Sequence, residues 1–163
     1  MSLICFLTMH FLATGGQPTP STPSSVSAAD IQAVGVDVVL YSTRGDIRIH
    51  ALSAVDLSHQ WSFELGIGAH ELICSPDSKW ALGTAYGGPG SGHQPADHRI
   101  AVFNLVDKSL HRTIDLSPLS RPNDGAFIAD GLHAYITVES PARIVKLNAE
   151  SGEFSQIELD RKA

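Results

Sequence analysis

Residues 69–84 read AHELICSPDSKWALGT, and residues 122–137 read PNDGAFIADGLHAYIT. The two stretches align without a gap at an offset of 53 residues, since 69 + 53 = 122 and 84 + 53 = 137. Each consists of a polar start, a short apolar run, a turn that contains an aspartate, and a second apolar run. The chain therefore repeats a strand–turn–strand unit.

A β-strand unit that recurs about every 40–50 residues is typical of propeller blades. From Val38 onward, period-2 runs alternate with turn signals, and no long helical periodicity interrupts them. We expect an all-β fold, a β-propeller made of four-stranded antiparallel blades at about 37–66, 67–116 and 117–160, all within one domain, 37–163. Because closed propellers have about four to eight blades, this should be a partial or truncated propeller.

Two details of the first blade and of the core follow from the same pattern. Strands are expected at Val38–Ser42, Ile47–Ala51 and Gln60–Leu65, whereas the fourth strand of this blade is either absent or weakly encoded in Ile31–Val36. The aromatic residues expected in the core between sheets are Trp61, Trp80, Phe103, Phe127 and Tyr135.

The N-terminal part differs from the rest in composition. Leu3–Ala13 is an apolar run of signal-peptide length, and Ala13-Thr14-Gly15 is a small-x-small site. We interpret residues 1–15 as a candidate signal segment, with a misassigned start codon or a disordered leader as alternatives. Residues 16–36 are rich in Pro, Ser and Thr and read as a flexible linker. A signal segment predicts an extracytoplasmic protein, periplasmic or secreted.

Composition disfavours several partners. The net charge is −6 and no basic patch is present, so nucleic-acid binding is not expected. No apolar run is long enough for a transmembrane span. The two cysteines, Cys5 and Cys74, cannot form a disulfide framework once the leader is removed.

Two local motifs resemble known families. Ala69–Glu71 with Ser75–Ser78, and Val145–Asn148 with Glu150–Gly152, are similar to the YVTN-type β-propellers, and this resemblance covers about 38–159. It implies a secreted or periplasmic propeller. Separately, Arg121–Ala126 resembles the R-P-N-D-G phrase of the gluconolactonase/senescence-marker family, which implies that Asn123 contributes to a divalent-metal site.

Propeller topology predicts where chemistry would gather. The loop between the second and third strands of a blade and the connection between blades emerge on one face, and residues 87–98 form a long insertion there. The candidate ligand-binding residues of this rim are His70, Glu71, His93, Asp97, His98, Asn123 and Asp124. Asn123, His93 and His98 are the candidate ligands of a divalent metal ion. The alternative is structural, with His70 and Asn123 bonding to neighbouring backbone.

The leading functional prediction is a non-enzymatic module that binds a protein or a small-molecule ligand on this face. A metal-dependent lactone hydrolase of the gluconolactonase kind is the runner-up, with the metal polarising the carbonyl and activating water; no catalytic residue is assigned. A fragment without independent function is the third alternative. Open blade edges also predict self-association.

Overall fold

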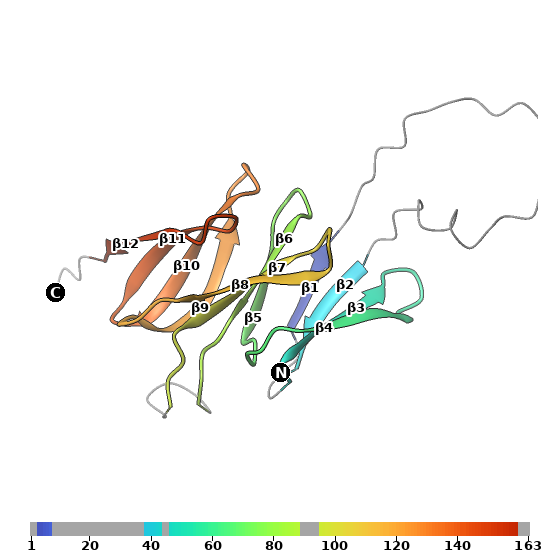
Figure 1. Ribbon diagram of the computed structural model, residues 1–163, viewed down its shortest axis with the longest axis horizontal. Helices are drawn as coiled ribbons and strands as arrows, with labels where there is room; N and C mark the ends of the chain where they lie inside the picture. Colours follow the sequence, from blue (N-terminus) through green and yellow to red (C-terminus); the bar gives the residue numbers. More distant parts are fainter. Residues whose placement is uncertain (1–2, 8–37, 44–45, 89–94, 160–163) are drawn as a thin grey trace, which may run out of the picture.

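The computed structural model describes residues 3–7, 38–43, 46–88 and 95–159, and within these ranges it contains strands and turns only. Three antiparallel sheets of four strands each follow one another along the chain (Figure 1). They are the blades of a partial β-propeller, as the repeat predicts. No helix in the described ranges is long and apolar enough to cross a membrane.

Each blade is a meander whose strands pair in chain order. Blade 1 consists of β1 (Leu3–Leu7), β2 (Val38–Ser42), β3 (Arg48–Ser53) and β4 (His59–Glu64). Blade 2 consists of β5 (Glu71–Cys74), β6 (Trp80–Thr84), β7 (Arg99–Asn104) and β8 (Ser109–Asp115). Blade 3 consists of β9 (Ser120–Phe127), β10 (His133–Ser140), β11 (Arg143–Asn148) and β12 (Phe154–Glu158).

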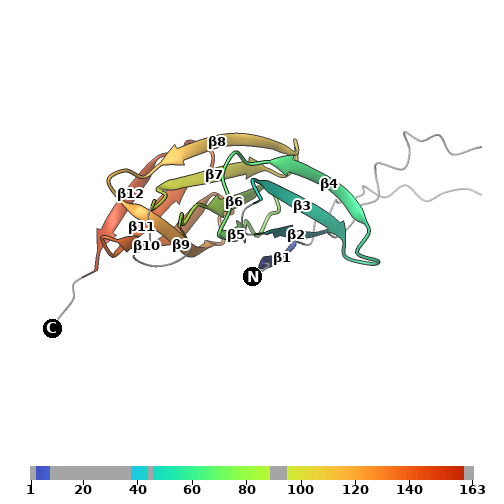
Figure 2. The same ribbon diagram turned by 90° about the horizontal axis from the view of Figure 1, so that it is seen from below.

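The three blades are arranged as a fan. Figure 2 shows the first strands, β1, β5 and β9, close together, whereas the last strands, β4, β8 and β12, spread apart. The first strands therefore lie nearest the axis of the propeller, and the last strands lie on its outer surface.

Two apolar cores hold the fan together, one in each gap between blades. Between blades 1 and 2, Phe103 is 1 % exposed and its ring lies 5.4 Å from that of Phe63 and 6.0 Å from that of Trp61. Between blades 2 and 3, fully buried aliphatic residues meet from both sheets, among them Leu82, Ile100, Val102, Ile136, Val145 and Leu147.

The burial pattern of the strands shows which blades are covered. In blade 2, four consecutive residues of β7 are buried, because both faces of this sheet pack against a neighbour. In β10 of blade 3 burial alternates instead, with Ala134, Ile136 and Val138 facing blade 2. Tyr135, which the sequence predicts in the core, lies on the opposite face and is 37 % exposed, because no blade among the described residues covers that face.

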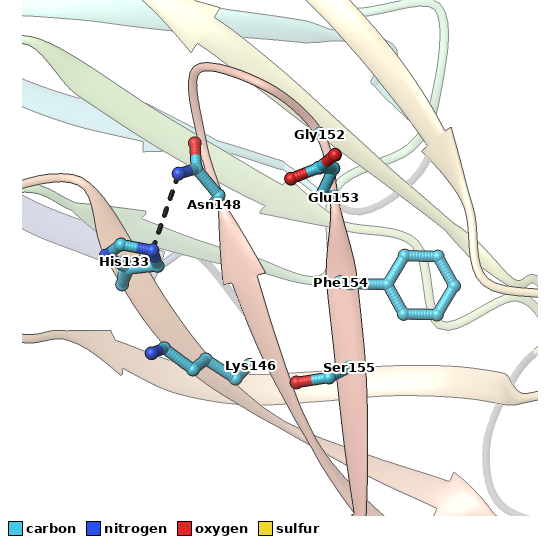
Figure 3. A pocket seen from close by; sticks show the side chains of 7 residues that line it. All are labelled: His133, Lys146, Asn148, Gly152, Glu153, Phe154 and Ser155. Atoms are coloured by element: carbon cyan, nitrogen blue, oxygen red, sulfur yellow. Dashed lines mark hydrogen bonds between the residues drawn. The ribbon is translucent and has the colours of Figure 1, made fainter.

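This outer face of blade 3 is hollowed at one end. A depression of about 660 Å³ is lined by residues of β10, β11, the β11–β12 turn and β12, including His133, Lys146, Asn148 and Phe154 (Figure 3). The depression lies at the edge of the fan, not between blades.

The structure differs from the sequence expectation in the N-terminal segment. Leu3–Leu7, assigned above to the candidate signal segment, pairs antiparallel with β2 and supplies the fourth strand of blade 1, with Leu7 opposite Val38. Ile31–Val36, the expected alternative, lies outside the described residues. An uninterrupted apolar run is typical of a signal segment and of a strand alike, so the strand could not be distinguished by pattern, and the signal segment stays a prediction.

Turns and loops separate to opposite ends of the blades. Ser75–Lys79 joins β5 to β6 at one end, and the connection from β6 to β7, which contains Gly87 and His98, leaves from the other end. The turn between β9 and β10 lies at the same end as Ser75–Lys79 (Figure 1). This is the arrangement that propeller topology predicts.

Candidate functional site

Hydroxyl groups join each blade to the next near the propeller axis. Thr84, at the end of β6, is fully buried and donates a 2.7 Å hydrogen bond to the carbonyl oxygen of Asn123 in blade 3. The same Thr84 oxygen accepts a hydrogen bond from the Glu71 N–H at 3.2 Å. Between blades 1 and 2, Ser42 at the end of β2 donates to the Ala69 carbonyl at 3.3 Å. These contacts fix the register in which neighbouring blades meet.

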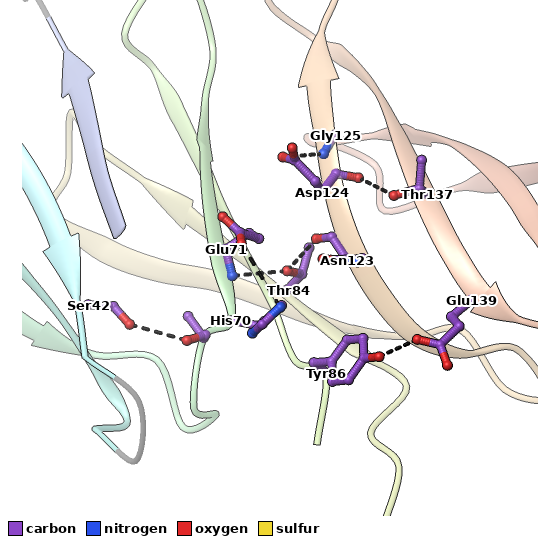
Figure 4. Close-up of polar contacts among 11 residues, drawn as sticks. Ser42, His70, Glu71, Thr84, Tyr86, Asn123, Asp124, Gly125, Thr137 and Glu139 are labelled. Carbon is purple, nitrogen blue, oxygen red and sulfur yellow. Dashed lines mark hydrogen bonds and ion pairs between the residues drawn. The ribbon is translucent and has the colours of Figure 1, made fainter. Parts of the chain in front are cut away.

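Four of the predicted rim residues lie around this junction (Figure 4). His70 and Glu71 stand at the start of β5, with His70 Nε2 4.0 Å from Glu71 Oε1. Asn123 and Asp124 lie in β9, the neighbouring first strand. Asn123 takes part in the junction through its backbone carbonyl. The topology therefore brings residues 53 positions apart to one place. His93 lies outside the described residues.

Asp97 and His98 lie at the base of the β6–β7 connection. Asp97 accepts hydrogen bonds from Arg99 Nε at 3.0 Å and Arg99 Nη2 at 2.7 Å, and also from the backbone N–H groups of His98 and Arg99. Burial raises the pKa of Asp97, but these hydrogen bonds outweigh it and hold the pKa below its usual value. His98 Nε2 lies 3.7 Å from Asp115, at the end of β8. Asp97 therefore has a structural role in anchoring the loop.

Three residues that the sequence analysis did not single out complete the rim. The rings of Tyr86 and His70 lie 4.7 Å apart in a tilted arrangement. The Arg121 guanidinium lies 4.8 Å from the centre of the Tyr86 ring, and Arg121 is almost fully buried. The Tyr86 hydroxyl donates a hydrogen bond to the Glu139 carboxylate of blade 3. Tyr86 and Glu139 are also 53 residues apart, so the repeat could have placed them on neighbouring blades.

The carboxyl group of Glu71 has a perturbed acidity. Burial raises its pKa above the usual value, nearby Asp124 raises it further, and His70 opposes both. Glu71 and Asp124 are thus close enough to repel each other when both are ionised, which favours the binding of a cationic or hydrogen-bond-donating group there.

A groove runs along the axis between β5 and β9. It has a volume of about 340 Å³ and is lined by apolar side chains with one carboxylate, namely Leu72, Ile73, Cys74, Pro76, Asp124, Ala126 and Phe127, together with Gly125. A concave, mostly apolar surface with few polar groups is the usual form of a ligand site, and this volume is at the small end of that class.

Two of the three candidate metal ligands, His98 and Asn123, lie in the described residues, and the third, His93, lies outside them. Within residues 38–43, 46–88 and 95–159, no three His, Cys, Asp or Glu side chains gather as a metal site would require. His98 pairs with Asp115, and Asn123 lies at the blade junction.

The three sheets of the described residues define a partial β-propeller. Among solved structures it is similar to the hydrazine synthase of Kuenenia stuttgartiensis, with a TM-score of 0.62 and 12 % identity over 76 % of this chain and 39 % of the other. It is also similar to the dihydro-heme d1 dehydrogenase NirN in complex with DHE, with a TM-score of 0.60 and 15 % identity over 76 % of this chain and 26 % of the other. At these identities the likeness concerns the fold.

No family model matches the chain, and no curated protein matches it. The chain spans well under half the length of the two structures that it resembles.

Proposed function

We propose that this chain is a ligand-binding β-propeller module that takes its ligand in the axial groove between β5 and β9. This proposal rests on the groove of about 340 Å³, which is lined mostly by apolar residues and bordered by Asp124. The ligand that fits this chemistry has an apolar body and a protonated amine, or another hydrogen-bond donor, as its head. A free small molecule and a side chain of a partner protein both satisfy it.

The acidic end of the groove supplies the specificity. Asp124 lies in the groove and close enough to Glu71 to raise its pKa. A bound cation would relieve this repulsion between carboxylates, whereas an anion would increase it. Binding should therefore strengthen as the pH rises through the elevated pKa of Glu71, because the ionised carboxylate attracts the cation.

Within the propeller class we propose the YVTN type and a location outside the cytoplasm. The support is the motif in Ala69–Glu71 with Ser75–Ser78, and the apolar run with the small-x-small site at 13–15. The lactone hydrolase alternative needs a divalent-metal centre, and no described contact favours it.

The binding proposal is tested by calorimetric titration with phenethylamine, which joins an apolar ring to an ammonium group, and with 3-phenylpropionate, which carries the opposite charge. The amine should bind, and Asp124→Asn should weaken it about 5- to 30-fold, which is the effect of losing a charged hydrogen bond of about 1–2 kcal/mol. Glu150→Gln, in the exposed β11–β12 turn, is the control. Equal binding of the two probes, or no effect of Asp124→Asn, would contradict the proposal.

A further inference from the structure

The outer face of blade 3 repeats the features by which blades 1 and 2 receive a neighbour. Ser42, Thr84 and Thr137 are each the fifth residue of the second strand of their blade. The first two hydroxyls donate to backbone carbonyls that lie in the first strand of the next blade or just before it. Thr137 is exposed on the outer face and donates instead to the Asp124 carbonyl of its own blade, at 2.9 Å. It therefore occupies the position of a junction hydroxyl, on a face that no other blade of the described residues covers.

The apolar residues of this face have the same placement. Tyr135 and Leu82 occupy equivalent positions of blades 3 and 2, and so do Ile144 and Ile100, which pair with Thr137 and Thr84 respectively. In blade 2, Leu82 and Ile100 are fully buried under blade 3. On blade 3, Ile144 is half-buried, Tyr135 is 37 % exposed and Ile157 is 49 % exposed. The depression of about 660 Å³ lies on the same sheet. The outer face of blade 3 thus resembles the face of blade 2 that packs against blade 3. A further blade of the same repeat would therefore fit against it.

The fan offers a matching surface at its other end. Ile49 and Ala51 of β3 face blade 2, so His50 and Leu52, which alternate with them, face away from it. Leu52 is half-buried, and His50 stacks with Tyr41 at 4.8 Å between ring centres. Both open faces are therefore mixtures of apolar and polar side chains, the composition of an interface between separately folded partners.

We propose that the outer face of blade 3 docks a second copy of this chain through the outer face of that copy's blade 1. The contact is head-to-tail. In both junctions between blades, a hydroxyl of one blade's second strand reaches backbone in, or just before, the first strand of the next blade. In a second copy, the first strand that follows no other described blade is that of blade 1. Two such contacts close a ring of two chains and six blades, within the range of about four to eight blades in closed propellers. The inference is independent of the ligand groove.

Sedimentation velocity and light scattering of the full chain across a range of concentrations test this proposal. The chain should be a dimer, and Ile144→Asp on blade 3 and Leu52→Asp on blade 1 should each make it monomeric. Thr137→Val should weaken the dimer about 2- to 10-fold. Val55→Asp is the control, since Val55 is 89 % exposed in the β3–β4 turn and should leave the dimer intact.

An equal mixture of Ile144→Asp and Leu52→Asp chains should recover dimers, because each chain contributes one intact face. Should Ile144→Asp fail to fold by circular dichroism, Tyr135→Glu replaces it, since Tyr135 is already exposed. A monomeric wild type, a dimer that survives the blade-3 variants, or a dimer unaffected by Leu52→Asp overturns the proposal. The last result would indicate contact between two blade-3 faces.

Discussion

Gly131 in blade 3 lies directly against Asp77 in blade 2. A Cβ atom built at position 131 would come within 2.7 Å of the Asp77 carboxyl carbon, and Gly131 has a φ of +69°. Asp77 is held by the Ser75 hydroxyl, which donates to it at 2.7 Å, and by the Lys79 N–H. The two turns therefore meet at the end of the blades opposite the rim.

Gly131→Ala should lower the free energy of unfolding by about 2–4 kcal/mol, because it combines a left-handed backbone with displacement of the Asp77 carboxylate. Gly66→Ala is the matched control, since Gly66 has a φ of +70° with open space around its Cβ position. It should cost only the backbone strain, about 1–2 kcal/mol. Urea unfolding measures both, and equal losses would show that the contact between turns has no energetic role.

Thr84→Val should destabilise the protein by about 1–3 kcal/mol. The substitution keeps the shape of the side chain but leaves the Asn123 carbonyl and the Glu71 N–H without their partner in a buried place. Thr113→Val, on an exposed position of β8, is the control and should change stability by less than about 0.5 kcal/mol. A Thr84→Val variant as stable as this control would mean that the junction hydroxyl does not hold the blades together.

Asp97→Asn should lower the melting temperature at neutral pH, because Asn loses the charged contact with Arg99. The folded pKa of Asp97 lies below the value of 3.8 for a free side chain. Its contribution to stability is therefore fully present above about pH 4 and is lost as the pH falls through the lower, folded pKa. Melting curves of both proteins should converge in acid. Asp107→Asn, on an exposed turn, is the control, and a difference that does not depend on pH would contradict this account.

A chain that begins at Gly16 should melt at least a few degrees lower than the full chain. Without β1, the N–H and C=O groups of β2 lose the antiparallel partner that runs from Leu3 to Leu7. Differential scanning calorimetry measures the change. Mass spectrometry of the protein recovered from an expressing cell shows whether residues 1–15 are retained. An unchanged melting temperature would support the signal-segment interpretation against the strand.

The repeat predicted the blades well because residues 53 positions apart occupy equivalent places in neighbouring blades, so the spacing indicates which residues lie at the same level as well as where strands occur. The same spacing makes His70 and Asn123 equivalent positions of neighbouring blades. Applied to Tyr86, the same spacing reaches Glu139, the residue with which Tyr86 forms a hydrogen bond. Arg121 could not be found in this way, because its burial under Tyr86 depends on how the β6–β7 connection folds back onto β9.

Two differences between the sequence expectation and the structure have the same physical origin. Tyr135 has the hydrophobicity of a core residue, but its burial depends on a neighbouring blade that local pattern cannot report. Leu3–Leu7 has the composition of a secretory segment, but pairing with Val38–Ser42 across residues 8–37 is a non-local event. In both cases the apolar composition was recognised correctly, and the outcome depended on parts of the molecule that are distant in the sequence.

Blade 2 is the sheet whose two faces both pack against described neighbours, and this arrangement should set the order of hydrogen exchange. In a stack where each unit contacts only the next, opening an end unit breaks one interface, whereas opening the middle unit breaks two. Amide protons of β6 and β7 should therefore exchange with solvent deuterium last, at a rate governed by global unfolding. Those of β3 and β11 should exchange earlier, through fraying of the stack from its ends. The chain would thus lose its order from both ends inward.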